Sequence, residues 1–430
     1  MEEKHETISK WIKLDNAATI YPATLSKKYA GMFRMSAQLR DTVDKEILSL
    51  ALNNVIKRFP MYRYQLKQGF FWHYFRFNDN IPIIQDDYRN PLVRINFKQN
   101  SNFMFRVRIF NKRISVEYFH SLTDGYGGIT FLLTLVAEYI RIKYKSKISY
   151  TKNILNPTEY ATKEEIKDSF LKYSRGYGEF IKEQPAYHQK GILEPSYKIN
   201  IISGKIPIDK VKEIAKEYNC TITQFIVSVM IDSFQTIQEQ EIKNIKKRKQ
   251  IKISIPINLR NIYNSNTLRN FSSYVNIGID PKYGHFSFKE IINEVKSNMS
   301  LMTTEKRLNA KITSNVKLAK NIFIRIIPMS IKKHILSLGE KLYGDRYVTS
   351  TMSNLGLIEV PKNITKYIDD LGFIIGRSRT NPGSGTCVGY NGNLYITFSR
   401  KIRETEFEKL FFRRFVELGI PVEIESNGGI

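Results

Sequence analysis

The sequence has few cysteines and no long hydrophobic run, and each absence narrows the class of protein. Cys220 and Cys387 are its two cysteines, which permit one disulfide but neither a disulfide framework nor a four-cysteine zinc site. No segment reaches the roughly 18 consecutive apolar residues of a membrane-spanning helix. The first residues, MEEKHETISK, contain no apolar core of a signal peptide. We therefore expect a protein of the reducing cytoplasm.

Negative charge is also scarce, because 41 acidic residues face 67 basic ones and the net charge is +26. Such a charge invites a nucleic-acid or anionic-membrane partner. The competing explanation is compositional, since Lys, Asn and Ile are over-used together, as AT-rich coding would produce. The charge is spread along the chain, with one local cluster at KNIKKRKQ (243–250), and no nucleic-acid recognition motif accompanies it. We expect no nucleic-acid partner. Peripheral membrane contact stays open, and a basic surface favours a phosphate-bearing substrate such as coenzyme A.

The length of 430 residues exceeds one ordinary core and predicts two domains. Apolar spacing predicts, in the first half, a strand at 30–39, a helix at 42–58 capped by Asp41, strands at 62–67 and 71–77, a hairpin at 105–119 and a helix at 129–140. In the second half it predicts helices at 208–219, 221–240, 287–306, 314–325 and 404–417, and strands at 252–260, 272–279, 346–356 and 387–402.

We therefore expect a mixed α/β fold with two halves of similar size, in which strands and helices do not alternate strictly. Residues 1–150 would form the N-terminal subdomain and residues 196–430 the C-terminal one. Residues 151–195 would link them, within a polar, tyrosine-rich crossover that is partly helical at 162–183.

The segment EYFHSLTDGYGG (117–128) is the strongest candidate for a functional site. It places His120 at the end of a predicted strand, Asp124 four residues later, and then Gly125, Gly127 and Gly128. A general base must lie at the end of an element that faces a cavity, and its ring must be held in one orientation. The glycines allow close backbone approach around such a ring. The alternative is a histidine with a purely structural role.

HSLTDG (120–125) fits HxxxDG, the signature of the acyltransferase superfamily with the chloramphenicol acetyltransferase fold, and three more segments resemble that superfamily. PINLR with NFSSY (256–260 and 270–274) resembles condensation domains of nonribosomal peptide synthesis. MSNLG (352–356) and LDNAATIYP (14–22) resemble the alcohol acetyltransferase-like branch. Phe119 stands where condensation domains usually carry a first histidine, and the DFGWG motif of plant acyltransferases is absent.

The resemblance implies two chloramphenicol acetyltransferase-like subdomains with an active-site channel between them. It implies that His120 is the general base for an alcohol or amine acceptor, which attacks an acyl thioester. Acyl-CoA would be the co-substrate, with no bound cofactor and no metal. The implied supporting residues are Asp124 paired with Arg260, Asn258 beside that arginine, and the oxyanion or positioning candidates Gly125, Ser353 and Asn354.

The sequence leaves several alternatives open for the function and for individual segments. The acyl donor could be a carrier protein that docks in trans, or the chain could be a non-catalytic binding member of the same fold. MSNLG could be no more than a turn after a strand, and Arg260 a solvated strand-end residue. NPGSGTCVG (381–389) lacks the lysine of a phosphate-binding loop, and Cys387 within it is expected to be a buried structural thiol.

Overall fold

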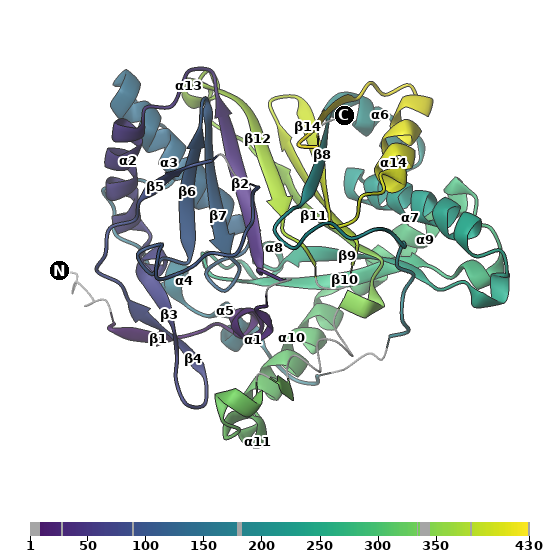
Figure 1. Ribbon diagram of the computed structural model, residues 1–430, viewed down its shortest axis with the longest axis horizontal. Coiled ribbons are helices and arrows are strands. Elements are labelled where there is room, and N and C mark those ends of the chain that lie inside the picture. The colour runs from purple at the N-terminus through teal and green to yellow at the C-terminus, as the bar shows by residue number, and fades with distance from the viewer. Residues whose placement is uncertain are drawn as a thin grey trace.

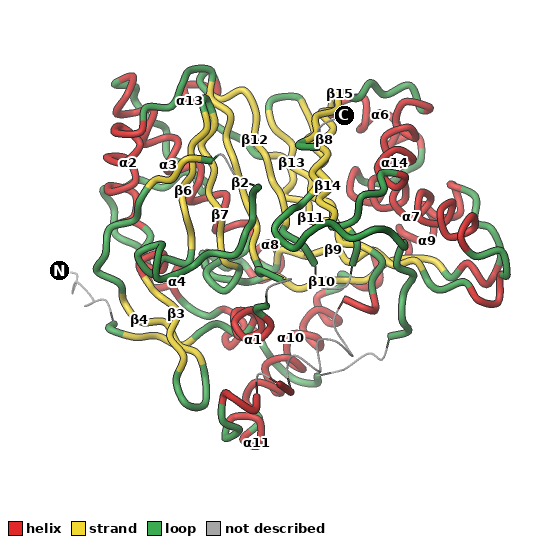
Figure 2. The backbone as a smooth tube through the Cα atoms, viewed as in Figure 1, coloured by secondary structure: helices red, strands yellow, loops and turns green. Residues whose placement is uncertain are grey.

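The computed structural model describes residues 9–26, 29–87, 90–178, 183–332, 334–335, 345–378 and 381–428. Within these ranges the chain forms two α/β halves that lie side by side, with the sheets toward the middle and helices on the outer sides (Figure 1, Figure 2). The fold class predicted from sequence, a mixed α/β architecture with two subdomains, is confirmed.

The first half contains most of a five-stranded sheet, in the order β12-β2-β7-β6-β5, and a separate three-stranded sheet, β1-β4-β3. Its elements are β1 (Trp11–Lys13), α1 (Ile20–Thr24), β2 (Met32–Leu39), α2 (Lys45–Arg58), β3 (Tyr64–Gln68), β4 (His73–Phe77), β5 (Ile84–Asp86), β6 (Phe105–Phe110), β7 (Arg113–Phe119) and α3 (Gly125–Tyr144). The predicted β6–β7 hairpin is present, and Asn111 supplies the positive φ of its turn.

The second half is a seven-stranded sheet in the order β10-β9-β11-β13-β14-β8-β15. After α3 the described chain forms α4 (Lys163–Ile166), α5 (Ser169–Tyr173), β8 (Asn200–Pro207), α6 (Ile208–Glu217), α7 (Ile222–Glu241), β9 (Ile251–Asn258), α8 (Arg260–Tyr263), β10 (Ser272–Ile279), α9 (Phe288–Met302), α10 (Glu305–Lys320), α11 (Ile322–Arg325), β11 (Ser350–Leu357), α13 (Lys362–Thr365), β12 (Ile368–Ile375), β13 (Gly383–Tyr390), β14 (Asn393–Arg400), α14 (Glu406–Glu417) and β15 (Glu423–Ser426). Of these, α4 and α13 pack on the N-terminal core through Ile166 and Ile364.

Strand β12 crosses from the second half to the first. It pairs antiparallel with β2, Phe373 opposite Met35, and so forms an edge of the N-terminal sheet (Figure 1). Gly372 faces Ser36 so closely that a β-carbon there would lie 2.5 Å from the serine hydroxyl. The range 196–430, taken from sequence as one subdomain, therefore contributes a strand to the other sheet. The segment IDDLGFII (368–375) carries no clear strand pattern, because its two acidic residues and its glycine have low β-propensity.

Several predicted boundaries are wrong for local reasons. The helix expected from residue 42 begins at Lys45, because Asp44 accepts the backbone N–H groups of Glu46 and Ile47, whereas Asp41 bonds the hydroxyl of Tyr144. The helix expected at 314–325 is instead α10 followed by α11, which a second cap at Asn321 separates. Helix within 162–183 is confined to α4 and α5, and 179–182 lie outside the described residues.

Apolar residues form two cores, one in each half. The first lies between the N-terminal sheet and helices α2 and α3, and the second between the C-terminal sheet and helices α7, α9 and α14. In the described part of the chain, no single helix has the length and apolarity to cross a membrane, and only the bent pair α6 and α7 passes that test jointly.

Candidate active site between the two halves

A cavity of about 1850 Å³ runs between the two halves and is lined by both. The N-terminal half contributes Tyr21, Phe33, His120, Asp124 and Gly125, and the C-terminal half contributes residues of β9, β10, β11 and α10. Strand β12 adds Phe373 and Ile375. All the site residues predicted from sequence, namely His120, Asp124, Gly125, Asn258, Arg260, Ser353 and Asn354, therefore line one space.

His120 follows the last residue of β7, and its backbone N–H donates to the carbonyl of Gly31 at 2.9 Å. Its ring stacks on Tyr21, with centroids 4.5 Å apart and planes 8° from parallel, and meets Phe33 edge-on at 5.0 Å. These aromatic contacts fix the ring plane at the cavity wall. Burial lowers the pKa of His120 below its ordinary value, more than its own backbone, Asp124 and Asn270 raise it. The ring is therefore neutral at neutral pH.

Asn270 sets the tautomer of that neutral ring. Its side-chain oxygen lies 3.3 Å from Nδ1 of His120, and its amide nitrogen donates to Asp15 Oδ2 and to the carbonyl of Ser121, both at 3.4 Å. Because the backbone carbonyl of Ser121 can only accept, the amide nitrogen of Asn270 faces that carbonyl and its oxygen faces the ring, so Nδ1 carries the proton of the neutral ring. Nε2 of His120 is then the nitrogen with the free lone pair, which a general base requires.

Asp124 and Arg260 form a buried ion pair, the pairing that the family resemblance implies. Arg260 Nη1 donates to Asp124 Oδ2 at 2.8 Å and Nη2 donates to Oδ1 at 3.1 Å, and both side chains are about 5% exposed or less. Asn258 supports the pair, since its side-chain oxygen accepts from the backbone N–H and from Nη1 of Arg260. The ring of Tyr126 covers the guanidinium, 4.7 Å away. Arg260 is therefore not a solvated strand-end residue.

The same carboxylate ties the histidine loop to the opposite half. Asp124 caps α3 through the N–H of Gly127 at 3.3 Å and accepts the N–H of Phe271 at 2.8 Å. A β-carbon at Gly127 would lie 2.3 Å from the carbonyl oxygen of Leu268, so only glycine allows this approach. Thr123 adds a hydroxyl bond to the same carbonyl at 2.7 Å. Asp124 thus orients the site by joining the two halves, and it does not lie free as a base.

The candidate oxyanion donors differ in how many hydrogen bonds their polar groups already make within the protein. Asn354 donates to the hydroxyl of Thr223 at 2.9 Å and accepts from the N–H of Gly356, which leaves one amide hydrogen for a ligand. Ser353 lies beside it on β11 and lines the cavity. Gly125 is the first residue of α3, where helix N–H groups have no partner within the helix. A β-carbon there would lie 2.9 Å from a methyl group of Leu355.

No role was predicted for Asp15, Tyr21 or Asn270. Tyr21 stacks on the His120 ring, Asn270 bonds its Nδ1, and Asp15 accepts from the amide of Asn270. Two of the quoted segments contain them, since LDNAATIYP includes Asp15 and Tyr21 and NFSSY begins with Asn270. Burial raises the pKa of Asp15 to about 6, although Arg269, at 3.4 Å, opposes the shift. The only sign of these residues in the sequence was their position inside segments that resemble the family. Their contacts around His120 depend on the tertiary fold.

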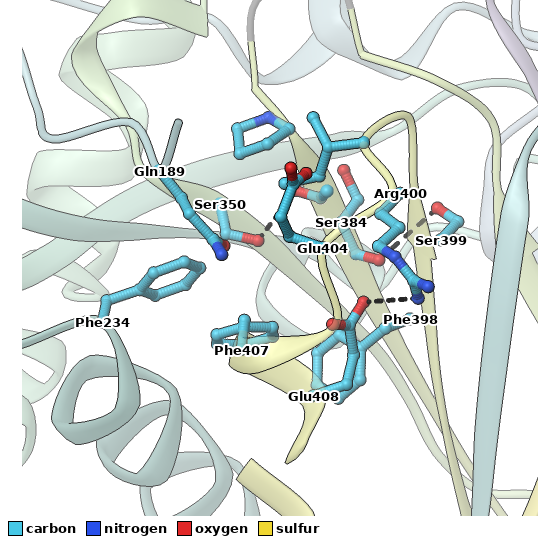
Figure 3. A pocket seen from close by; sticks show the side chains of 13 residues that line it. Gln189, Phe234, Ser350, Ser384, Phe398, Ser399, Arg400, Glu404, Phe407 and Glu408 are labelled. Carbon is cyan, nitrogen blue, oxygen red and sulfur yellow. Dashed lines mark hydrogen bonds and ion pairs between the residues drawn. The ribbon is translucent and has the colours of Figure 1, made fainter. Parts of the chain in front are cut away.

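A second, much smaller cavity lies inside the C-terminal half and belongs to a different set of residues (Figure 3). Its volume is about 10 Å³, room for about one water. Arg400 bonds Glu408 across it at 3.1 Å, and burial raises the pKa of that glutamate. No predicted site residue lines this space, so we assign it a structural role. Among the described residues, no group of three or more His, Cys, Asp or Glu side chains is placed to hold a metal ion.

Comparisons with solved structures show the same fold over nearly the whole chain. Polyketide synthase associated protein 5 from Mycobacterium tuberculosis matches with a TM-score of 0.60 and 13% identity, covering 94% of this chain and 96% of that one. TRI3 trichothecene 15-O-acetyltransferase from Fusarium sporotrichioides gives 0.61 and 11%, covering 97% and 96%. The starter condensation domain of rhizomide synthetase RzmA, in complex with C8-CoA, gives 0.61 and 12%, covering 95% and 94%.

The chain therefore has the fold of condensation domains and related acyltransferases, with two chloramphenicol acetyltransferase-like subdomains. At this identity the likeness establishes the fold and leaves the activity open. Neither a protein-family model nor a curated protein sequence matches the chain.

Proposed function

We propose that the protein transfers an acyl group from acyl-CoA to an alcohol or amine acceptor, with His120 as general base. One observation carries the proposal: the His120 ring, with Nδ1 3.3 Å from the side-chain oxygen of Asn270, stands in the wall of a cavity between the two halves. That arrangement leaves Nε2 free to accept a proton. The fold, which acetyltransferases and CoA-bound condensation domains share, supports the same chemistry.

The reaction would proceed by direct transfer. Nε2 of His120 takes the proton from the acceptor hydroxyl or amine as the acceptor attacks the thioester carbonyl. The resulting tetrahedral oxyanion collapses, the C–S bond breaks, and the protonated histidine returns the proton to the leaving thiolate. General-base action of this kind contributes about 10²–10⁴ in rate, and one well-placed oxyanion donor contributes on the order of 10²–10³. We propose the Gly125 N–H, Ser353 and Asn354 for that donor role.

No covalent acyl-enzyme is needed in this scheme. Cys387, expected from the sequence to be a buried structural thiol, is fully buried inside β13, and burial raises the pKa of that thiol. A protonated, inaccessible thiol is a poor nucleophile. The cavity volume of about 1850 Å³ also exceeds the 300–1,000 Å³ typical of a pocket for one small ligand. It therefore has room for the acyl-thioester arm and the acceptor together.

The test is acceptor-dependent thiol release from acetyl-CoA and longer acyl-CoAs, with pooled alcohols and amines, for wild type and His120→Ala. His285→Ala is the matched control, because that ring is exposed and pairs with Glu239. We expect release that needs an acceptor, falls at least about 10²-fold in His120→Ala and is unchanged in the control. Release only from an acyl-N-acetylcysteamine or carrier-bound thioester would assign the donor to a carrier protein. No release from any donor by the folded protein would refute catalysis.

A further inference from the structure

The cavity opens beside a group of exposed apolar side chains that no part of the described chain covers. They come from the loop between β3 and β4 and from the segment around α11, which lie together at the lower edge of the molecule in Figure 1. We call this surface the apolar rim, and it consists of Phe70, Trp72, Leu318, Ile322, Phe323, Ile326 and Ile331. Phe70 is 72% exposed and Phe323 74%.

Hydrogen bonds hold the two parts of the apolar rim together. The N–H of Met329 donates to the carbonyl of Phe70 at 2.7 Å, and the amine of Lys332 donates to the carbonyl of Phe71 at 2.8 Å. Trp72 and Leu318 of the apolar rim also line the cavity. The rim is therefore one surface at the cavity mouth, rather than two unrelated exposed segments.

The charge around the apolar rim has one sign. Residues 306–335 contain no aspartate or glutamate. Lys320, Arg325 and Lys332 line the cavity mouth, and Lys317 lies exposed on α10. Aromatic and aliphatic side chains beside lysine and arginine are the composition of protein surfaces that insert into the interface of an anionic bilayer.

We propose that the apolar rim docks this protein onto an anionic lipid surface, with the cavity mouth facing the bilayer. Phe70, Trp72 and Phe323 would enter the acyl-chain boundary, and the cations would contact lipid phosphates. The rim protrudes as a loop tip and a short helix (Figure 1), which suits shallow insertion better than a flat protein interface. Docking to the lipid surface does not depend on the proposed function. Docking would also let an apolar acceptor or acyl chain pass directly from the bilayer to His120, and this second statement rests on the proposed function.

The test is cosedimentation of the full chain with vesicles of phosphatidylcholine alone and of phosphatidylcholine with phosphatidylglycerol, without CoA. Two double variants separate the apolar contribution from the electrostatic one. Phe70→Ser with Phe323→Ser removes apolar side chains, and Lys320→Gln with Arg325→Gln removes positive charges. We expect binding to the anionic vesicles, about tenfold or more weaker in the first variant and about 25-fold weaker in the second, since each cation near such a surface contributes about fivefold. Binding to neutral vesicles is expected to be weak.

Matched controls remove the same kinds of side chain elsewhere. Tyr283→Ser with Val416→Ser removes exposed apolar groups, and Lys246→Gln with Lys247→Gln neutralises cations of the local cluster at 243–250. Both controls should bind as wild type does. Equal losses in the controls and the rim variants would show that net charge and general stickiness cause binding, and would overturn the proposal.

Trp72 provides a second readout that needs no change to the apolar rim. The chain has two tryptophans, so Trp11→Phe leaves Trp72 as the sole one. We expect its fluorescence to shift to shorter wavelength with anionic vesicles and to be quenched by brominated lipid. A spectrum unchanged by vesicles would overturn the proposal, as would tight binding of an acidic carrier protein to the rim in the absence of vesicle binding. If the wild-type protein binds vesicles but releases no thiol from any donor, the proposed function is refuted and the docking proposal is not.

Discussion

The buried ion pair between Asp124 and Arg260 allows a sharp test of what the aspartate of the motif does. Replacing Asp124 by Asn keeps the shape but removes the charge and one acceptor. Asp124 now accepts two bonds from Arg260 and one each from the N–H groups of Phe271 and Gly127. The substitution leaves a guanidinium buried without its counter-charge, which costs about 3–5 kcal/mol in comparable cases.

The expected change in melting temperature follows from chain length. At about 2 cal/mol/K per residue, unfolding of 430 residues as one unit carries an entropy of about 0.9 kcal/mol/K. A loss of about 4 kcal/mol then lowers Tm by about 4 °C, and by roughly twice that if the two halves unfold separately. Asp86→Asn is the matched control, because that carboxylate is 61% exposed in its pair with Lys45 and should shift Tm by under about 1 °C.

Calorimetry and chemical denaturation of the single and double variants would measure the pair directly. Removing both partners, as in Asp124→Asn with Arg260→Met, should cost less than the sum of the two single changes, because neither charge is then left unpaired. The reasoning is refuted if Asp124→Asn melts as wild type does while acyl transfer disappears. That result would give the carboxylate a direct chemical role.

Three further predictions follow from the same geometry. The lowered pKa of His120 should place the acid limb of the pH–rate profile below about pH 6.5. Any stability that this ring contributes should be complete above that pH and lost as the pH falls through the lower folded-state pKa. An acid limb above pH 7 would contradict the neutral ring. Gly127→Ala should lower Tm by several degrees, because its β-carbon would overlap the carbonyl oxygen it faces, whereas Gly428→Ala, with its nearest contact at 3.6 Å, should not. A maleimide reagent should label Cys220, which is partly exposed, and spare Cys387 until the protein is denatured; rapid native labelling of both would show that the β13 interior opens.

The local elements were largely predictable, because their signals lie within a few residues. The hairpin turn at Asn391 and Gly392 has the two positive φ angles that the Asn-Gly pair predicts. Helix α7 begins after Thr221 through a capping box with Gln224. Errors appeared where two caps compete, as at Asp41 and Asp44, or where a helix breaks without glycine or proline, as at Asn321.

The side-chain contacts within the candidate site could be predicted only in part. The pairing of Asp124 with Arg260 came from a family resemblance, and the structure confirms it across 136 residues of sequence. The contact between His120 and Asn270, separated by 150 residues, was not predicted. Neither was the stacking of Tyr21 on the same ring. An asparagine in a loop and a tyrosine near the chain start carry no local pattern that points to a distant histidine.

The sequence alone determined the order and type of most elements, the placement of His120 at a strand end and the glycines that follow it, because period, capping and turn chemistry act between near neighbours. Only the tertiary structure decided that β12 joins the N-terminal sheet, that Asn270 sets the histidine tautomer and that the apolar rim meets the cavity mouth. Those outcomes depend on packing between segments far apart in the chain, and that packing minimises the free energy of the whole fold rather than of any short segment.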